Sequence, residues 1–551
     1  MSSERHYFQS DEAYYAIRDL ARPGIWTVYV GLGATIDRTN VDWPTFVRKL
    51  LVYCAGDAIS EEAIVRWVQE LGPQRAATTA ETLARGRYGD GWVQHIQDGI
   101  RQTLYSPRRH MGGRLLSALA DWAHAMAHMG GSVVLVTANY DDYLYDELLT
   151  FHSKSEWAAD VREPKLVVLG SDDGDRALPE GWDEPGNITC VHVHGFVPAE
   201  GKPARGIPAI GELSYGLTGP ATRSVLKTVF AKSHVLVIGS SITDPPLVDT
   251  LIEDAQDRTG DEELMRLAFQ PRQGMPWDRS EPRHRELLVL NERRLEMMGL
   301  KSITPDYYGQ VSQVMSDASI WTIKTDADRL LNESDERRYD NRVERWWNGW
   351  FTLARGSESG GKPENVRQNL HYQLLAAALP SLRNILKASP DERLKIEVWV
   401  RWKPATDRQL GLWACSTGPW PDHPRDIRLS DISDKSAIKA VRVFCAGAPI
   451  LFEREDESGS RWQSYYGYPI WHAVPDGRFM AGVVVVASRN PISRTTQSCL
   501  SEDNLKRVQI AALWLDEIGR HIMDDQATEA NLTEFVEELR SRKPGVPRER
   551  R

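Results

Sequence analysis

Val133-Val134-Leu135-Val136-Thr137-Ala138-Asn139-Tyr140-Asp141-Asp142 is the stretch that decides the fold. Its four consecutive aliphatic residues predict a strand buried on both faces, as in a parallel sheet. The strand ends in amide and carboxylate side chains, at the end where parallel sheets place their ligands and their chemistry. Turn chemistry alone explains an Asn and two Asp equally well, so the neighbouring segments have to decide between the two interpretations.

A glycine-containing loop follows the first predicted strand of the chain. Ile25 to Val30 reads as a short strand that runs directly into Gly31-Leu32-Gly33-Ala34-Thr35. The two glycines let the backbone turn sharply and approach a phosphate closely. A helix is predicted next, with Asp42 as its N-cap and Pro44 in its first turn. A lone Gly-x-Gly is as compatible with a plain tight turn as with a cofactor loop.

Histidines end a later strand. After an apolar run at Leu166 to Leu169, the strand Ile188 to Val193 closes in His192-Val193-His194-Gly195. Strand periodicity places His192 and His194 on one face, with His194 nearer the open carboxyl end of the sheet. A histidine in a strand is more often a hydrogen-bonded core residue than a catalytic one. The glycine after His194 favours the catalytic interpretation, because it lets a ligand come close.

Small hydroxyl-bearing residues end another buried strand. Val235 to Ile238 is followed by Gly239-Ser240-Ser241-Ile242-Thr243-Asp244-Pro245-Pro246, whose NH and OH groups suit ribose or phosphate oxygens. Lys301 to Thr304 is predicted as one more strand. The segment from Glu61 to Leu104 is mostly helical, and its residues indicate no particular chemistry. It could be an insertion that covers a cleft.

Length, charge and cysteine usage exclude several classes of protein. A length of 551 residues predicts two to four domains. The net charge of -10 argues against general electrostatic binding of nucleic acid. The mean hydropathy is -0.44, and neither a signal peptide nor a run of transmembrane length is visible, so a cytoplasmic protein is expected. The cysteines form no Cys-x-x-Cys pair, which argues against a zinc site and a disulfide framework, and no metal is expected.

Taken together and in order, these strand ends resemble the sirtuin fold over roughly residues 20 to 325. Gly31 to Thr35 is similar to the family's Gly-Ala-Gly-x-Ser cofactor loop, and Thr137 to Asp141 to its Thr-Gln-Asn-x-Asp. His194-Gly195 is similar to the catalytic His-Gly, and Gly239 to Ser241 to Gly-Thr/Ser-Ser.

Two later details resemble the prokaryotic sirtuin-like NAD hydrolases of antiphage defence more than the protein deacetylases. They are Tyr215 and the Gly-Ser-Ser-x-x-Asp-Pro pattern at Gly239 to Pro245. The chain departs from the family at Leu32, which replaces a small residue, and at Thr35, which replaces Ser. The absence of the deacetylases' four-cysteine zinc module counts against an acetyl-lysine substrate.

The resemblance implies a Rossmann-like α/β domain over residues 1–330, with NAD as its substrate. It implies that Asn139 holds the ribose or the attacking water, that Asp141 contacts the nicotinamide carboxamide, and that His194 is the base at the ribose hydroxyls. The reaction would cleave the bond between nicotinamide and ribose, depleting NAD in an abortive response to infection. The residues assigned to cofactor binding are Gly31, Gly33, Ala34, Thr35, Gly239, Ser240, Ser241 and Asp244.

The second half predicts a separate α+β domain. Residues 331–365 contain a helical cluster with Trp346, Trp347 and Trp350 and a linker at Gly356 to Pro363. The cluster is interpreted as core or interface packing, which is more common for such a stripe than a base-stacking platform. The order helix, mixed strands and long helix, with Ser460-Arg461-Trp462 through Gly482-Val483-Val484-Val485, resembles a GAF-type domain over residues 366–525. GAF-type domains sense a small molecule or dimerise, and residues 526–551 are predicted to be a charged tail. The predicted elements of this domain are helices at Leu370–Leu386 and Glu502–Met523, a half-buried strand at Leu394–Trp402, and strands around Leu412, Val441–Phe444, Tyr465–Trp471 and Met480–Ala487.

Because an enzyme that destroys NAD is toxic unless it is restrained, the second domain or a partner is expected to regulate the first. A homo-oligomer is expected, with a small-molecule or protein activator, or a nucleic-acid-sensing partner subunit, and no membrane. Two alternatives stay open. The first domain could be a non-catalytic sensor of NAD or ADP-ribose, or it could be an NAD-dependent deacylase or ADP-ribosyltransferase.

Overall fold

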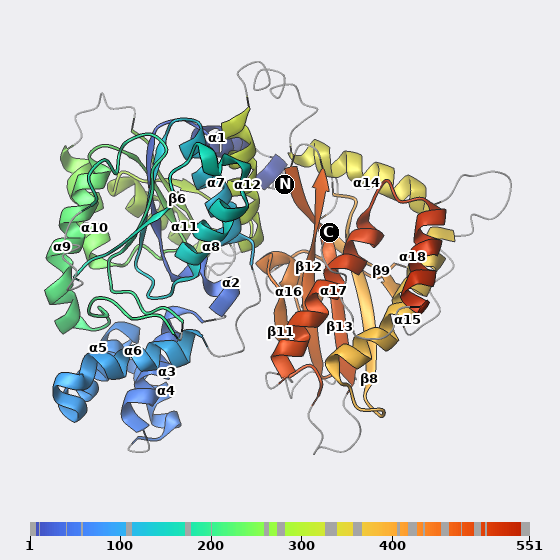
Figure 1. Cartoon of the computed structure of the whole chain (residues 1–551), viewed down its shortest axis with the longest axis horizontal. Helices are drawn as coiled ribbons and strands as arrows, with labels where there is room; N and C mark the ends of the chain where they lie inside the picture. The colour runs from blue at the N-terminus through green and yellow to red at the C-terminus, as the bar shows by residue number, and fades with distance from the viewer. Residues whose placement is uncertain are drawn as a thin grey trace.

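The computed structural model in Figure 1 consists of two sheet-containing parts joined through helix α12. The structure describes residues 7–9, 11–39, 41–56, 59–105, 113–170, 178–199, 201–257, 264–272, 282–324, 339–355, 366–404, 408–416, 427–433, 436–452, 462–474, 477–489, 498–501 and 504–541.

The first part is built on a seven-stranded sheet in which every pairing is parallel, with the order β3-β4-β2-β1-β5-β6-β7. This confirms the predicted Rossmann-like architecture. The central strands are apolar runs because helices bury both of their faces. The strands are β1 (Ile25–Val30), β2 (Ser132–Thr137), β3 (Lys165–Val168), β4 (Ile188–His192), β5 (His234–Ile238), β6 (Arg266–Phe269) and β7 (Lys301–Ile303).

Two groups of helices cover this sheet. One core forms between the sheet and α1 (Asp11–Leu20), α7 (Leu115–His128), α8 (Tyr143–Lys154) and α12 (Tyr308–Ile323). On the other face lie α9 (Glu212–Phe230), α10 (Pro245–Asp257) and α11 (Pro282–Met297). The strand ends are therefore the part of the sheet that a ligand can approach.

A group of four helices stands apart from these layers, at the lower left of Figure 1. It contains α3 (Trp43–Ala55), α4 (Glu61–Leu71), α5 (Pro73–Tyr88) and α6 (Trp92–Leu104). The Asp42 carboxylate caps α3 by accepting from the Thr45 amide at 2.9 Å, as the sequence predicted. The helices share one core with Tyr140, Val197 and Ile210 from loops beyond the strand ends. The insertion therefore packs over the loops that follow the strands.

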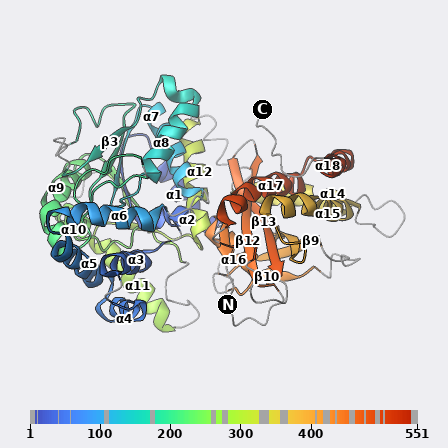
Figure 2. The same ribbon diagram turned by 60° about the horizontal axis from the view of Figure 1, so that its bottom comes forward.

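The second part is a six-stranded antiparallel sheet of order β10-β9-β8-β13-β12-β11. Figure 2 shows α15 and α17 lying along one side of it, and α16 packs on the other side. Its strands are β8 (Arg393–Trp402), β9 (Gln409–Cys415), β10 (Leu429–Asp431), β11 (Ile450–Phe452), β12 (Ser464–Val474) and β13 (Gly477–Arg489). Its helices are α14 (Tyr339–Arg355), α15 (Val366–Leu386), α16 (Lys439–Ala446), α17 (Leu505–Met523) and α18 (Glu529–Ser541).

The structure corrects three predictions in this second part. Val441–Phe444, predicted as a strand, lies in α16, which ends at Gly447 in the left-handed conformation. From Val398 onward β8 is buried on both faces instead of half-buried, because it pairs with β9 and β13 and carries helices on both sides. The segment predicted as a charged tail contains α18, whose apolar face is buried. The predicted linker at 356–363 and the basic end at 543–551 lie outside the described residues.

The tryptophan cluster of α14 packs as the sequence predicted. Trp346, Trp347 and Trp350 are buried, and the indole NH groups of Trp346 and Trp350 donate to the carbonyls of Met523 (2.9 Å) and Ile522 (2.7 Å). These bonds join α14 to the end of α17. The cluster is therefore part of the core of the second domain.

Helix α12 joins the two parts through backbone and charge contacts. A Cβ on Gly309 would lie 3.1 Å from the Gly447 Cα at the end of α16, so the two helices touch through their backbones. The buried Asp317 of α12 accepts from Arg342 of α14 at 2.9 Å. Gln313 also donates to a carbonyl of β13. A change in the second domain can therefore reach α12 directly.

Candidate functional site at the carboxyl ends of the first sheet

Four loops leave the sheet at one level. The register pairs Val30 with both Thr137 and Ile238, and Thr137 with His192. The loops that begin one residue later therefore start side by side. Strand β1 lies between β2 and β5, so the chain runs to opposite sides of it, which is where ligands bind in open α/β sheets.

The predicted glycine loops pack against each other. The Gly31 amide donates to the Ile238 carbonyl at 2.9 Å and the Gly33 amide to the Gly239 carbonyl at 2.8 Å. A Cβ on Gly31 would lie 2.6 Å from the Gly239 oxygen. Gly239 has a φ of 65°, and a Cβ on it would lie 2.3 Å from the Ala34 nitrogen. The glycines are therefore needed for contact between the loops, in addition to any approach to a phosphate.

Asn139 belongs to a buried network with the first loop. Its side chain is 4% exposed, and its Nδ2 donates to the Gly31 carbonyl and to the Thr35 hydroxyl, both at 3.3 Å. The Thr35 hydroxyl also lies 3.2 Å from the Leu32 carbonyl and 3.4 Å from Asp141 Oδ2. The structure thus brings the side chains of Asn139, Asp141 and Thr35 together.

Asp141 is a buried acid with a perturbed pKa. It is 1% exposed, and its Oδ1 accepts from the Tyr143 amide at 3.3 Å. Burial raises the pKa of Asp141 to about 7, and the neighbouring Asp142 adds to the rise. Asp142 is tied down separately, by Tyr105 at 2.7 Å and Lys202 at 3.2 Å. The two neighbouring acids therefore have different roles, and Asp142 holds the surrounding loops.

The two histidines have different environments. His192 Nδ1 lies 2.9 Å from the Asn139 carbonyl, and the ring packs edge-on against Phe196. Burial lowers the pKa of His192 to about 4, which fits a neutral structural residue. His194 is 1% exposed, and its Nε2 lies 3.0 Å from Asp244 Oδ1. Within the part of the chain that the structure describes, its Nδ1 has no hydrogen-bond partner.

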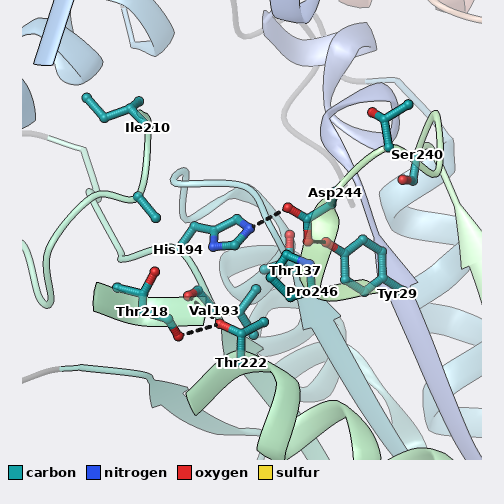
Figure 3. Close-up of polar contacts among 12 residues, drawn as sticks. Tyr29, Thr137, Val193, His194, Ile210, Thr218, Thr222, Ser240, Asp244 and Pro246 are labelled. Atoms are coloured by element: carbon teal, nitrogen blue, oxygen red, sulfur yellow. Dashed lines mark hydrogen bonds and ion pairs between the residues drawn. The ribbon is translucent and has the colours of Figure 1, made fainter. Parts of the chain in front are cut away.

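Asp244 is held by protein groups on both of its oxygens (Figure 3). Oδ1 faces His194, and Oδ2 accepts from the Tyr29 hydroxyl at 2.8 Å. Burial opposes ionisation of Asp244, but His194, Tyr29 and Tyr215 outweigh it and hold the pKa of Asp244 below its usual range. The ring of Tyr215 lies 4.8 Å from the His194 ring. Asp244 was predicted among the cofactor-binding residues, and the structure engages it with a histidine.

The other hydroxyls of the second loop lie nearer to solvent. Ser241 and Thr243 are exposed and their hydroxyls are 2.8 Å apart, while the half-buried Ser240 accepts from the Ile242 amide at 3.0 Å. The buried Ile242 between them has a φ of 55°, an uncommon conformation for a β-branched residue. The loop thus presents two hydroxyl groups outward and directs Asp244 inward.

Sequence reasoning missed two residues of this site. Tyr29 was treated only as part of the first strand, although a tyrosine in a fully buried strand needs a polar partner. Glu81 of α5 is buried, forms an ion pair with Arg85 at 2.7 Å and accepts from the Ser214 hydroxyl at 2.9 Å near the start of α9. It ties the helical insertion to the helix that carries Tyr215, and nothing local in the sequence indicated that contact.

Residues 133–298 match the sequence model of the SIR2-like domain. This part of the chain is therefore similar to SIR2-like domains. The match begins within β2, so it supports the predicted sirtuin-like domain over 133–298 and leaves out the Gly31–Thr35 loop, which the fold nevertheless places in the same sheet. No curated protein matches the chain.

SIR2-like domains bind NAD, and the match therefore associates the chain with NAD-related activity. Among the residues that the structure describes, no three His, Cys, Asp or Glu side chains gather as metal ligands would. Of the helices within the described ranges, none is long and apolar enough to cross a membrane.

Proposed function

We propose that the chain hydrolyses NAD⁺ at the bond between nicotinamide and ribose. The observation that carries the proposal is the register of β2 and β4. Thr137 is paired with His192, and Asn139 and His194 each stand two residues farther along. An amide and an imidazole therefore leave neighbouring strands at equivalent positions, beside the glycine loops of the SIR2-like fold.

The site suits cleavage through an oxocarbenium-like ribose. Such a reaction needs a group that orients the ribose or water and a base that accepts a proton as the nucleophile attacks. Water forms a bond to the anomeric carbon and gives its proton to the base, while the electron pair of the broken bond leaves with nicotinamide. His194 has a buried ring nitrogen that meets no hydrogen-bond partner in the described ranges, and Asn139 lies on the loop that would face the dinucleotide.

The remaining residues fit substrate binding. We assign contact with the dinucleotide to the loop of Gly31, Gly33, Ala34 and Thr35 and to the hydroxyls of Ser240 and Ser241, since the two loops lie side by side at the strand ends. Hydroxyl and NH groups at strand ends recognise ribose and phosphate oxygens. Because burial raises the pKa of Asp141 to about 7, its protonated form is available to donate to the nicotinamide carboxamide, which is the contact that the sequence resemblance implies.

The test is nicotinamide release by the purified full-length chain, with infected and uninfected bacterial extracts as sources of an activator. Asn139→Ala and His194→Ala should each abolish release while circular dichroism stays unchanged. His128→Gln and Asn348→Ala, at positions outside the site, should keep full activity. Full turnover by both site variants would refute the assignment.

Mass spectrometry of the bound nucleotide separates the competing functions. ADP-ribose after incubation supports hydrolysis, whereas intact NAD⁺ would identify a sensor. Transfer of ADP-ribose to protein, or removal of an acyl group from a peptide, would identify a transferase or a deacylase. Light scattering of the same preparation tests the expected homo-oligomer.

We further infer that NAD⁺ cleavage serves defence against phage and that the second domain, proposed to be GAF-like, restrains it. The support is the direct contact of α12 with α16 and β13. Gly309→Leu, which would force a side chain against Gly447, should change NAD⁺ loss before or after infection. If the folded variant has the same NAD⁺ levels as the wild type both before and after infection, the second domain does not regulate NAD⁺ cleavage.

A further inference from the structure

We propose that Asp244 is a positioning residue that holds the His194 imidazole with its proton on Nε2, so that Nδ1 is the base. This inference rests on the proposed function, and it replaces the cofactor-binding role that the sequence resemblance gave to Asp244.

The hydrogen bonds around Asp244 fix the direction of the proton. The Tyr29 hydroxyl donates to Oδ2 at 2.8 Å, and Oδ1 lies 3.0 Å from His194 Nε2. An ionised carboxylate only accepts hydrogen bonds, so Nε2 must carry a hydrogen. In the neutral ring Nδ1 then keeps its lone pair.

The other ring nitrogen is placed to use that lone pair. Nδ1 of His194 is buried and has no hydrogen-bond partner among the described residues, although most buried polar atoms have one. A ribose hydroxyl or a water could supply the missing partner. When Nδ1 accepts its proton the ring becomes a cation, and the carboxylate of Asp244 stabilises that cation at 3.0 Å.

The carboxylate is itself held in place. Ile242, buried at a φ of 55°, turns the loop, and the Val248 amide donates to the Asp244 carbonyl at 3.0 Å as α10 begins. The ring of Tyr215 covers the imidazole at a centroid distance of 4.8 Å. The orientation of His194 is therefore set by three different elements, β1, α9 and the loop before α10.

The test compares Asp244→Asn with Asp249→Asn, which removes a half-buried carboxylate of α10 that pairs with Arg223 of α9. Asp244→Asn should lower kcat about 100-fold and leave KM nearly unchanged, because the base is misoriented while the binding groups remain. Tyr29→Phe, which removes one donor to Asp244, should lower kcat roughly tenfold. Asp249→Asn should match the wild type. Wild-type kcat in Asp244→Asn, or an equal rise in KM and fall in kcat, would overturn the proposal.

A second measurement does not depend on turnover. In the full-length chain with isotope-labelled histidine, the His194 signals are assigned by their loss in His194→Gln. The wild type and Asp249→Asn should show the tautomer with its proton on Nε2, and Asp244→Asn should shift toward the other tautomer or a mixture. A wild-type ring protonated on Nδ1 would overturn the proposal. Absence of nicotinamide release by the wild type would instead refute the proposed function, and the tautomer would still decide the role of Asp244.

Discussion

Replacing Asp141 with asparagine should stabilise the SIR2-like domain at neutral and alkaline pH. Burial raises the pKa of Asp141 from 3.8 to about 7. The hydrogen bonds around Asp141 also favour its protonated form. The Thr35 hydroxyl has one hydrogen but lies near both the Leu32 carbonyl and Asp141, and a protonated Asp141 leaves that hydrogen for Leu32. Asparagine has nearly the same shape, with an oxygen for the Tyr143 amide and an NH₂ group for Thr35.

The pH dependence has a definite sign. The folded pKa of Asp141 lies above its unfolded value, so between pH 4 and pH 7 the folded state binds more protons than the unfolded state. The contribution of Asp141 to the stability of the wild type is therefore fully present below about pH 4 and is lost as the pH rises toward 7. Each pKa unit corresponds to about 1.4 kcal/mol, so Asp141→Asn should be more stable by up to about 4 kcal/mol at pH 8 and about equal near pH 4.

The assay is urea unfolding at pH 5, 6.5 and 8, read by hydrogen exchange of peptides from β2 so that the first domain is followed separately from the second. Asp90→Asn, at an exposed position, is the matched control and should change stability by less than about 0.5 kcal/mol at every pH. If Asp141→Asn is no more stable than the wild type at pH 8, or if the difference does not grow with pH, Asp141 is ionised in the folded chain and the reasoning is wrong.

Three other substitutions have clear expected outcomes. Gly239→Ala should destabilise the SIR2-like domain by more than about 1 kcal/mol and abolish nicotinamide release, because a β-carbon there meets the facing loop. Its control is Gly216→Ala on the open surface of a helix, which should be neutral or slightly stabilising in the same urea assay. Trp350→Ala should cost the second domain about 3–5 kcal/mol, read by hydrogen exchange of β13 peptides, and an unchanged value would contradict its place in the core. Arg342→Met should lower the free energy of unfolding in urea by about 3–5 kcal/mol, because it removes the cation that faces the buried Asp317. Adding Asp317→Leu should recover most of this loss. If the double variant recovers no stability, the ion pair is not the cause.

The first domain could be predicted from the sequence because its signals are local. A strand such as Ser132–Thr137, buried on both faces, is a continuous apolar run, and its end is marked by polar residues within two positions. Helix caps such as Asp42 are equally local. The Gly31, Asn139 and His194 motifs directly follow such strands. Once the strands were predicted to be parallel, the motifs were therefore predicted to lie at one edge of the sheet.

The second domain was harder because short apolar runs are ambiguous. Val441–Phe444 contains two β-branched residues and reads as a strand, yet it forms α16 because its buried residues face one side of the sheet at helical spacing. Gly447, three residues later, was the overlooked sign of a helix end.

The roles of single site residues depended on contacts that no local pattern contains. His194 and Asp244 are 50 residues apart, and Tyr29 is 215 residues from Asp244. Sequence spacing placed Asp244 among groups that suit a phosphate or ribose, and only the fold showed that both of its oxygens are already engaged. Likewise the glycines suggested room for a ligand, whereas in the structure part of that room is filled by the opposite loop.

The two halves of the site are mechanically joined through those glycine loops. Asn139 binds the Gly31 carbonyl, Gly33 binds the Gly239 carbonyl, and five residues beyond Gly239 the chain presents Asp244 to His194. Since the loops touch backbone to backbone, neither can shift without the other. A displacement of the first loop would therefore move both Asn139, to which we assign the orientation of the substrate, and Asp244, to which we assign the orientation of the base. The same contact that keeps the site assembled thus makes both proposed roles sensitive to one perturbation, as the proposed restraint of NAD⁺ cleavage would require.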